Sequence, residues 1–176
     1  GKFGKMIWEY ANGIDNSPVN YTQEKPKGIG NSITLPVDYS NIDEISKILL
    51  ELTEQVTYRL RKEKMLANVV NVQLKDKDFR VYSHQRKMDS PTSSTKIIYS
   101  EVKKLVNELY KKGTLIRLVG VRVDNLIDEK DKQISLFEDE QNEKQEKIDN
   151  ALDKLKDKYG YNFIKRGSDI KTIKKN

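Results

Sequence analysis

Basic and polar side chains alternate along residues 79–88, FRVYSHQRKM, in the middle of the chain. Arg80, Tyr82, His84 and Arg86 occupy every second position there, and such residues share one face of a β-strand. A row of this kind suits phosphate oxygens, because Arg and Lys displace counterions from a polyanion. The row therefore predicts a surface that holds a nucleic-acid backbone. The solvated outer face of an ordinary sheet would carry the same residue types, so both interpretations stay open.

Polar side chains on neighbouring segments could extend this surface across a sheet. They are Ser32, Thr34, Asn71, Gln73, Lys75, Lys87 and Arg117. In the last apolar segment, LIRLVGVRV, Arg117 and Arg122 fall on opposite faces of a strand unless a bulge lies between them. Tyr82 is the one aromatic in the polar register, whereas small RNA-binding modules stack bases on several aromatics of their sheet. The pattern does not favour an RNA-binding module.

Residues that could catalyse a reaction do not converge in the sequence. Two-metal phosphoryl transfer needs carboxylates close together on a rigid scaffold, but Asp76 and Asp78 lie in an expected turn and the others lie on helix exteriors or in the tail. The chain has no Cys and a single His, which excludes thiolate and multi-histidine metal sites. The Gly28-Ile29-Gly30 sequence precedes a strand and opens no helix, so it predicts no phosphate-binding loop. We expect no catalytic residue, metal or cofactor in this chain.

Apolar periodicity predicts the elements that position these side chains. Period two indicates strands and a 3.6-residue period indicates helices. The expected strands are 28–36, 67–74, 79–88 and 115–123, and the expected helices are 41–62 and 96–112. The order β-α-β-β-α-β predicts an α+β fold, the split βαβ arrangement, with a four-stranded sheet and both helices on one face. The other face of the sheet is left free to bind a partner.

Composition changes along the chain divide it into five expected segments. They are a short helical segment (1–19), a polar linker (20–27), the sheet domain (28–125), a flexible charged tail (126–146) and a C-terminal helix with a basic tail (147–176). The first residue is not Met, which suggests a fragment of a longer protein. No run of 18 apolar residues exists and the mean hydropathy is -0.77, so we expect a soluble protein.

The net charge of +6 is unevenly distributed along the chain. The sheet domain holds 17 basic and 12 acidic side chains, whereas residues 126–176 hold 12 of each. This excess favours a polyanion as the partner of the sheet domain. In the tail, Leu136 and Phe137 are adjacent apolar residues within a charged stretch. The pocket of another protein could bury such a pair, as it does in short anchored peptides. On composition alone, two apolar residues in a tail are unremarkable, and an ordinary exposed pair is the more common explanation.

Several strings of residues resemble one known family, in family order over roughly residues 1–137. KGIGNSITLP, FRVYSHQRKM, TSSTKIIY and IRLVGVRVDNL resemble the little-finger domain of Y-family DNA polymerases, nearest to the DNA polymerase IV branch. YANGIDNSPV is similar to the end of that family's thumb domain, and QISLF (133–137) resembles the bacterial pentapeptide that binds the sliding clamp.

The resemblance implies that the sheet lies against the major-groove side of primer-template DNA and follows both backbones. It implies phosphate contacts from Ser32, Ser83, His84 and Arg86, together with Lys27 and Arg117. His84 departs from the family pattern, because relatives often carry a basic residue there. The resemblance also implies clamp contacts from Gln133, Ile134, Leu136 and Phe137, with Gln133 in the clamp groove and the last two in the apolar pocket.

We therefore expect the non-catalytic, DNA- and clamp-binding part of a DNA-directed DNA polymerase that acts in translesion synthesis and DNA repair. The family's palm and fingers, which hold Mg²⁺ and the nucleotide, have no counterpart in this sequence. We expect a monomer in the bacterial cytoplasm, associated with the nucleoid and with no membrane partner. A free-standing βαββαβ nucleic-acid-binding module, or a protein-interaction domain, stays open as an alternative.

Overall fold

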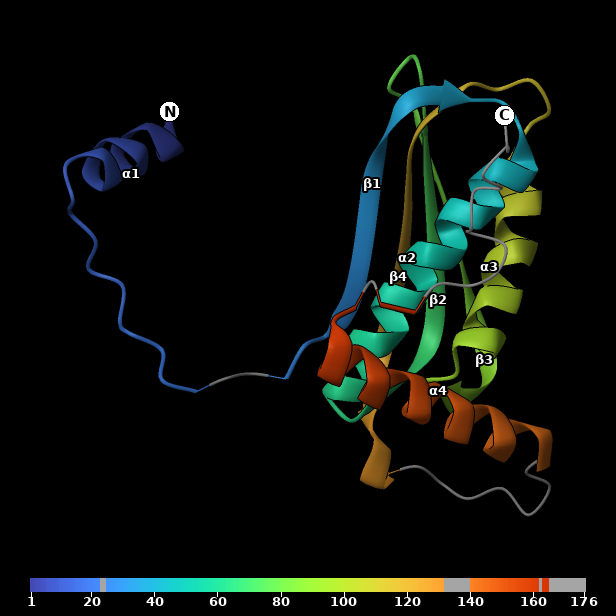
Figure 1. Ribbon diagram of the computed structural model, residues 1–176. Coiled ribbons are helices and arrows are strands. Elements are labelled where there is room, and N and C mark those ends of the chain that lie inside the picture. The colour runs from blue at the N-terminus through green and yellow to red at the C-terminus, as the bar shows by residue number, and fades with distance from the viewer. Residues whose placement is uncertain (23–24, 132–139, 162, 165–176) are drawn as a thin grey trace.

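A four-stranded antiparallel sheet with helices on one face forms the centre of the computed structural model (Figure 1). The structure describes residues 1–22, 25–131, 140–161 and 163–164. The helices and strands in chain order are α1 (Lys2–Ala11), β1 (Gly28–Tyr39), α2 (Ile42–Lys62), β2 (Met65–Asp76), β3 (Val81–Thr92), α3 (Thr95–Leu109), β4 (Ile116–Asp128), the 3-10 turn η1 (Glu129–Asp131) and α4 (Glu140–Tyr159). The predicted β-α-β-β-α-β order and α+β class are confirmed.

The strands lie in the order β1-β4-β2-β3, so the last strand is inserted between the first two. Every neighbouring pair is antiparallel. Strand β4 continues to Asp128, three residues beyond the end at residue 125 that the sequence suggested for the domain. Strands β1 and β3 form the two edges of the sheet.

Local sequence explains why α2 forms where it does. Asn41 caps its first turn by accepting a hydrogen bond from the Asp43 backbone N–H at 2.8 Å. Acidic residues occupy the first turn and basic residues the last turn, as the helix dipole favours. Its buried apolar residues follow a helical stripe: Ile45, Leu49, Leu52, Val56 and Leu60.

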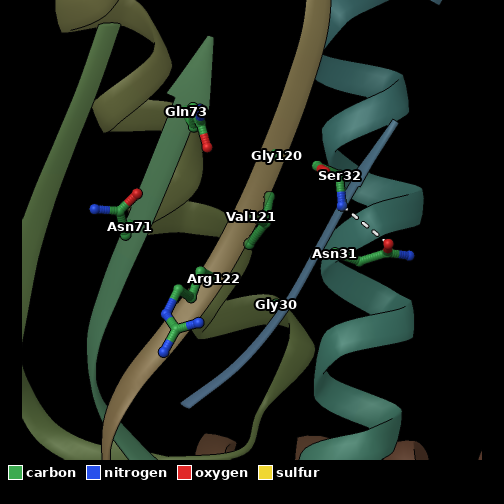
Figure 2. A pocket seen from close by; sticks show the side chains of 8 residues that line it. All are labelled: Gly30, Asn31, Ser32, Asn71, Gln73, Gly120, Val121 and Arg122. Atoms are coloured by element: carbon green, nitrogen blue, oxygen red, sulfur yellow. Dashed lines mark hydrogen bonds between the residues drawn. The ribbon is translucent and has the colours of Figure 1, made fainter. Parts of the chain in front are cut away.

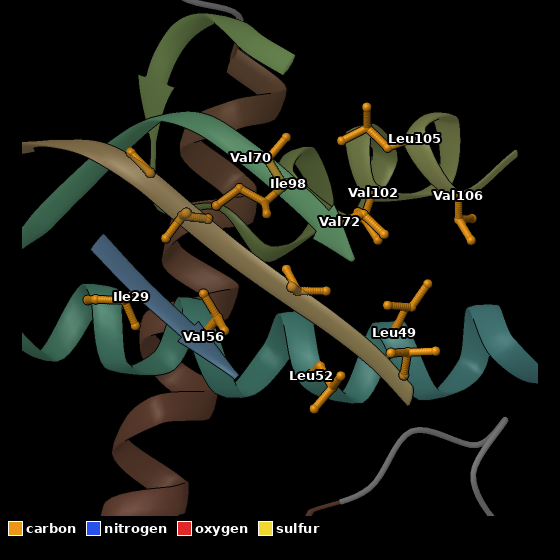
Figure 3. Packing of buried hydrophobic residues seen from close by; sticks show 14 of the residues in the cluster. Ile29, Leu49, Leu52, Val56, Val70, Val72, Ile98, Val102, Leu105 and Val106 are labelled. Carbon is orange, nitrogen blue, oxygen red and sulfur yellow. The ribbon is translucent and has the colours of Figure 1, made fainter. Parts of the chain in front are cut away.

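The core lies between the sheet and the pair α2 and α3 (Figure 3). Strands β2 and β4 turn Val70, Val72 and Val121 toward the helices, where each is at most 1% exposed. From α3, Ile98 and Val102 enter the same cluster. Burying branched side chains on this face fixes which face of the sheet meets solvent, because a shift of one residue would reverse every side chain.

Helix α4 packs through charged side chains against α2 and the start of α3 (Figure 1). The Arg61 guanidinium donates to both carboxylate oxygens of Asp153, at 2.6 and 2.9 Å. Asp149, which is 3% exposed, accepts a hydrogen bond from the Thr95 backbone N–H at 3.0 Å and so caps α3. The helix begins seven residues before the segment start at 147 that the sequence suggested.

Helix α1 lies apart from the sheet (Figure 1), and residues 14–22 after it form neither helix nor strand. The helix ends at Ala11, and Gly13 in the turn that follows adopts a φ of 72°, a conformation that glycine accepts without strain. Ile7 and Trp8 are 62% and 61% exposed, so the apolar side of this helix has little contact with the rest of the chain. Among the described residues, no helix is long and apolar enough to cross a membrane.

Candidate nucleic-acid interface

The free face of the sheet, opposite α2 and α3, carries mostly polar side chains. On β2, Val70, Val72 and Leu74 point to the helices, so Asn71, Gln73 and Lys75 point to the free face. Strand register then assigns the free-face positions of the other strands. They are Gly28, Gly30, Ser32 and Thr34 on β1, Leu118, Gly120, Arg122 and Asp124 on β4, and Val81, Ser83, Gln85 and Lys87 on β3.

The free face is basic overall. Lys75, Lys87 and Arg122 are its three basic side chains at the register positions above, and Asp124 is its one acidic side chain. The net charge of these positions is therefore +2. Short polar side chains between the charges leave the backbone accessible. A surface of this kind suits phosphate groups better than base edges.

A shallow hollow of about 320 Å³ lies at the centre of the free face (Figure 2). Residues of three strands line it: Gly30, Asn31, Ser32, Asn71, Gln73, Gly120, Val121 and Arg122. Ser32 lies opposite Gly120, and Gln73 lies opposite Gly120 from the other side. The hollow thus brings hydroxyl, amide and guanidinium groups around a stretch of bare backbone.

Two glycines of β1 make room for Arg122. A Cβ at Gly30 would lie 3.0 Å from Cβ of Arg122 and 3.2 Å from the Val121 carbonyl oxygen. A Cβ at Gly28 would lie 2.2 Å from Oδ1 of Asp124 and 2.4 Å from Nη2 of Arg122. The missing side chains allow the guanidinium to lie along β1. There its Nε donates to the two carboxylate oxygens of Asp124 at 2.7 and 3.0 Å.

His84 and Arg86, which the sequence placed on the free face, lie on the other face. Arg86 is opposite the buried Val70 and His84 is opposite the buried Val72, so both point toward the helix layer. Arg80 precedes the strand, and Tyr82 shares the register of the buried Leu74. The predicted alternation is correct, but the register assigned to the free face is wrong. The free face carries Ser83, Gln85 and Lys87 instead.

Acidic side chains of α3 explain why basic residues occupy the helix side of β3. The Arg86 guanidinium bonds to Glu108 and lies 3.5 Å from Oε2 of Glu101. The hydrogen bond that Arg86 donates to Glu108 raises the pKa of Arg86, and desolvation opposes this increase. His84 Nδ1 lies 3.2 Å from Oε2 of Glu108. Because β3 is an edge strand, the side chains of His84 and Arg86 contact the polar edge of α3. The neighbouring strands β2 and β4 supply the buried core residues on this side of the sheet.

The other predicted contact residues occupy three different places. Ser32 and Ser83 lie on the free face, Ser32 at the central hollow and Ser83 opposite Gln73. Lys27 is exposed immediately before β1. Arg117 lies in a bulge of β4, between the pairs Ile116–Asp76 and Leu118–Lys75, with its guanidinium 5.2 Å from the centre of the Phe79 ring. Gln133, Ile134, Leu136 and Phe137 lie outside the described residues.

Arg122 lines the hollow but was not among the contact residues predicted from the sequence. The signal was present, because Gly30 and Gly120 leave space only on the strand face that also carries Arg122.

The β2–β3 turn is held by Asp76, whose carboxylate accepts hydrogen bonds from the N–H groups of Asp78 and Arg80 and from the Tyr82 hydroxyl. Desolvation raises the pKa of Asp76, but these hydrogen bonds outweigh it and hold the pKa below its usual value.

The part of the chain that the structure describes contains no candidate metal site. No group there of three or more His, Cys, Asp or Glu side chains could hold a metal ion. Several acidic residues of this part make ion pairs with Arg and Lys, as Asp153 does with Arg61 and Asp128 with Lys25.

Comparison with known proteins identifies the sheet domain. Residues 26–136 match the model of the impB/mucB/samB family C-terminal domain. The chain is 39% identical to a DNA polymerase IV of Clostridium acetobutylicum over 163 residues, which cover 93% of this chain and 41% of that protein. It is 33% identical to a DNA polymerase IV of Acetivibrio thermocellus, covering 95% of this chain and 43% of that protein. The chain thus spans less than half the length of these relatives.

Solved structures show the same fold. The insertion ternary complex of Dbh DNA polymerase matches with a TM-score of 0.52 and 21% identity over 70% of this chain and 35% of that chain. DinB from Sulfolobus solfataricus matches with a TM-score of 0.52 and 22% identity over the same shares of the two chains.

Proposed function

The chain belongs to the impB/mucB/samB family, and from this premise we propose that it is the DNA-holding C-terminal part of a DNA-directed DNA polymerase. The two relatives compared above are DNA polymerases IV, and they extend well beyond the region that this chain spans. The observation that carries the proposal is the free face of the sheet, whose register positions are mostly polar and have a net charge of +2. A duplex can lie on this face without any change in the core.

The proposed contacts are to the DNA backbone. Lys75, Lys87 and Arg122 supply positive charge, and Ser32 and Ser83 supply hydroxyl groups. Because Gly30 has no Cβ, the Arg122 side chain lies over the strand there, and a phosphate group at this position would meet the guanidinium. Contacts of these types position a protein on DNA without reading its sequence. A polymerase that moves along its template requires binding of this kind.

We infer that residues 133–137, QISLF, bind the sliding clamp. The support is the likeness of this pentapeptide to the bacterial clamp-binding motif and the adjacent apolar pair Leu136 and Phe137 in a charged stretch. In a peptide of this kind a few apolar side chains supply most of the binding energy. Recruitment by a clamp would place the DNA-holding domain at a primer terminus.

The intact parent protein would add nucleotides opposite damaged template bases, using Mg²⁺ held by a palm domain that this chain does not contain. This role in translesion synthesis and repair rests on the family alone, as does a place in the cytoplasm near the nucleoid. A polymerase assay on the 176-residue chain should show no nucleotide addition. Nucleotide addition by the chain itself would contradict the assignment of its function to binding.

Titration of fluorescent primer-template DNA at two salt concentrations, with and without clamp, tests the proposal. We expect salt-sensitive DNA binding by the chain, and clamp binding that is lost in Leu136→Ala/Phe137→Ala. The same double variant serves as the control for DNA binding, which should not change. DNA binding that does not depend on salt would contradict the backbone contacts, and clamp binding by the variant would contradict the role of the peptide.

A further inference from the structure

Helix α4 has a surface that neither the sheet domain nor the proposed function uses. The helix packs through its acidic side: Asp149 and Asp153 bind Thr95 and Arg61, and Asp157 accepts from the Tyr58 hydroxyl. Asp149 and Asp153 are largely covered, with side chains 3% and 15% exposed, whereas Asp157 is 56% exposed beside Lys62. Lys154 and Lys158 are exposed on the side of the helix away from Asp149, whereas Lys156 is covered beside Glu54.

The outward side of α4 carries two adjacent rows of side chains. One row holds the exposed Lys147, Lys154 and Lys158, and the other holds Ile148, Leu155 and Tyr159, each one position later. The spacing i, i+7, i+11 keeps each row on one line, about 16 Å long at 1.5 Å per residue. Ile148, Leu155 and Tyr159 are 52%, 40% and 50% exposed, which is unusual for a helix that otherwise packs on a domain.

Two aromatic rings lie at the end of these rows. Tyr159 and Phe163 stack with their ring centres 4.9 Å apart at an angle of 27°, and Phe163 is 65% exposed. Lys158 Nζ lies 5.1 Å from the centre of the Tyr159 ring. Exposed aromatic rings beside lysines are the features with which proteins hold single-stranded nucleic acid, because bases stack on the rings and phosphates meet the cations.

We propose that this α4 outer face, formed by Lys147, Lys154, Lys158, Tyr159 and Phe163, is a second nucleic-acid site that binds a single strand. It does not depend on the proposed contacts of the sheet, because α4 lies on α2 and α3, the layer opposite the free face. A charged protein or an anionic membrane could also meet the lysines and the rings. Polyglutamate and phosphatidylglycerol vesicles therefore serve as competitors in the test.

The test is the binding of fluorescein-labelled oligo(dT) of about 20 nucleotides to the full 176-residue chain, measured by anisotropy across a salt series. We expect Lys154→Glu/Lys158→Glu to bind at least about tenfold more weakly, with a salt slope reduced by about 1.4. Tyr159→Ala/Phe163→Ala should also weaken binding about tenfold, with an unchanged salt slope, because stacking involves no counterions.

Matched controls are Lys111→Glu/Lys112→Glu and Tyr21→Ala, which change equally exposed residues elsewhere. Unchanged oligo(dT) affinity in both α4 variants would overturn the proposal, as would competition by polyglutamate or by phosphatidylglycerol vesicles as strong as that by the oligonucleotide. Loss of single-strand binding in Lys75→Ala/Lys87→Ala alone would assign the strand to the sheet and would also overturn it. Loss of duplex binding in that variant, with oligo(dT) binding kept, supports two separate sites.

Discussion

Replacing Lys75 and Lys87 with alanine should weaken the binding of primer-template DNA about 60-fold at about 0.1 M salt. Both residues lie on the free face, Lys75 on β2 and Lys87 on the edge strand β3. Each cation that contacts a phosphate contributes about 0.9 to the slope of log K against log salt, which corresponds to about eightfold in affinity at 0.1 M. Two lost contacts therefore reduce the slope by about 1.8.

The matched control for this prediction is Arg86→Ala, which removes one cation from the opposite face of the same strand. Arg86 is held by Glu101 and Glu108, so its loss should lower the melting temperature slightly and leave DNA affinity within about twofold. Fluorescence anisotropy at four salt concentrations measures affinity and slope together. Circular dichroism shows whether each variant is folded.

Binding of DNA on the free face would be refuted if the two variants behaved the other way round. A large loss of affinity in Arg86→Ala, with binding by Lys75→Ala/Lys87→Ala unchanged, would mean that DNA lies along the edge between β3 and α3. A loss of affinity with no change in salt slope would show that the two lysines do not contact phosphates.

Three further predictions concern the packing that holds this surface. Arg61→Ala should cost about 3 kcal/mol in the free energy of unfolding, measured with urea, because Asp149 and Asp153 are left buried without their cation; a loss below 1 kcal/mol would contradict this. The hydrogen bond from Lys25 lowers the pKa of Asp128 in the folded state below its usual value of 3.8. The Lys25–Asp128 pair therefore stabilises the fold fully above pH 3.8, and this stabilisation is lost as the pH falls through the lower folded-state pKa. Urea unfolding from about pH 6 down to about pH 2 should show a shallower fall for Lys25→Ala than for the wild type, and equal curves would contradict the pair. Gly30→Val should fill the hollow, displace Arg122 and weaken duplex binding several-fold, whereas Gly4→Ala in α1, which meets no atom within 4 Å, should not.

The architecture was predictable because its apolar periods are regular. The stripe from Ile45 to Leu60 sets α2, and alternating Val70, Val72 and Leu74 set β2 with one face buried. These patterns depend on neighbouring residues and on a single core, so they can be recognised in the sequence.

The register of β3 was harder to predict than the helices and strands themselves, because both faces of this edge strand are polar. The decisive signal lies in the turn: Lys75 pairs with Val81, so even-numbered residues of β2 and β3 share a face. Since Val70, Val72 and Leu74 are buried, His84 and Arg86 must face the helices. A three-residue turn over residues 76–78, as the sequence suggested, gives the same parity and would have corrected the assignment.

The docking of α4 could not be predicted from its pattern. The spacing of Ile148, Leu152 and Leu155 suggests an apolar buried side, yet Ile148 and Leu155 are exposed and the helix packs through Asp149 and Asp153. The bond between Arg61 and Asp153 joins residues 92 positions apart. A pairing of charges over such a distance has no periodic signature, whereas burial of apolar residues does.

Site-specific crosslinking from single cysteines tests the central claim most directly, because the chain contains no Cys of its own. Ser83→Cys and His84→Cys introduce a thiol at neighbouring positions on opposite faces of β3. With primer-template DNA that carries a thiol-reactive tether on a backbone phosphate, we predict rapid crosslinking of Ser83→Cys and little of His84→Cys. Preferential crosslinking of His84→Cys would contradict binding of DNA on the free face of the sheet.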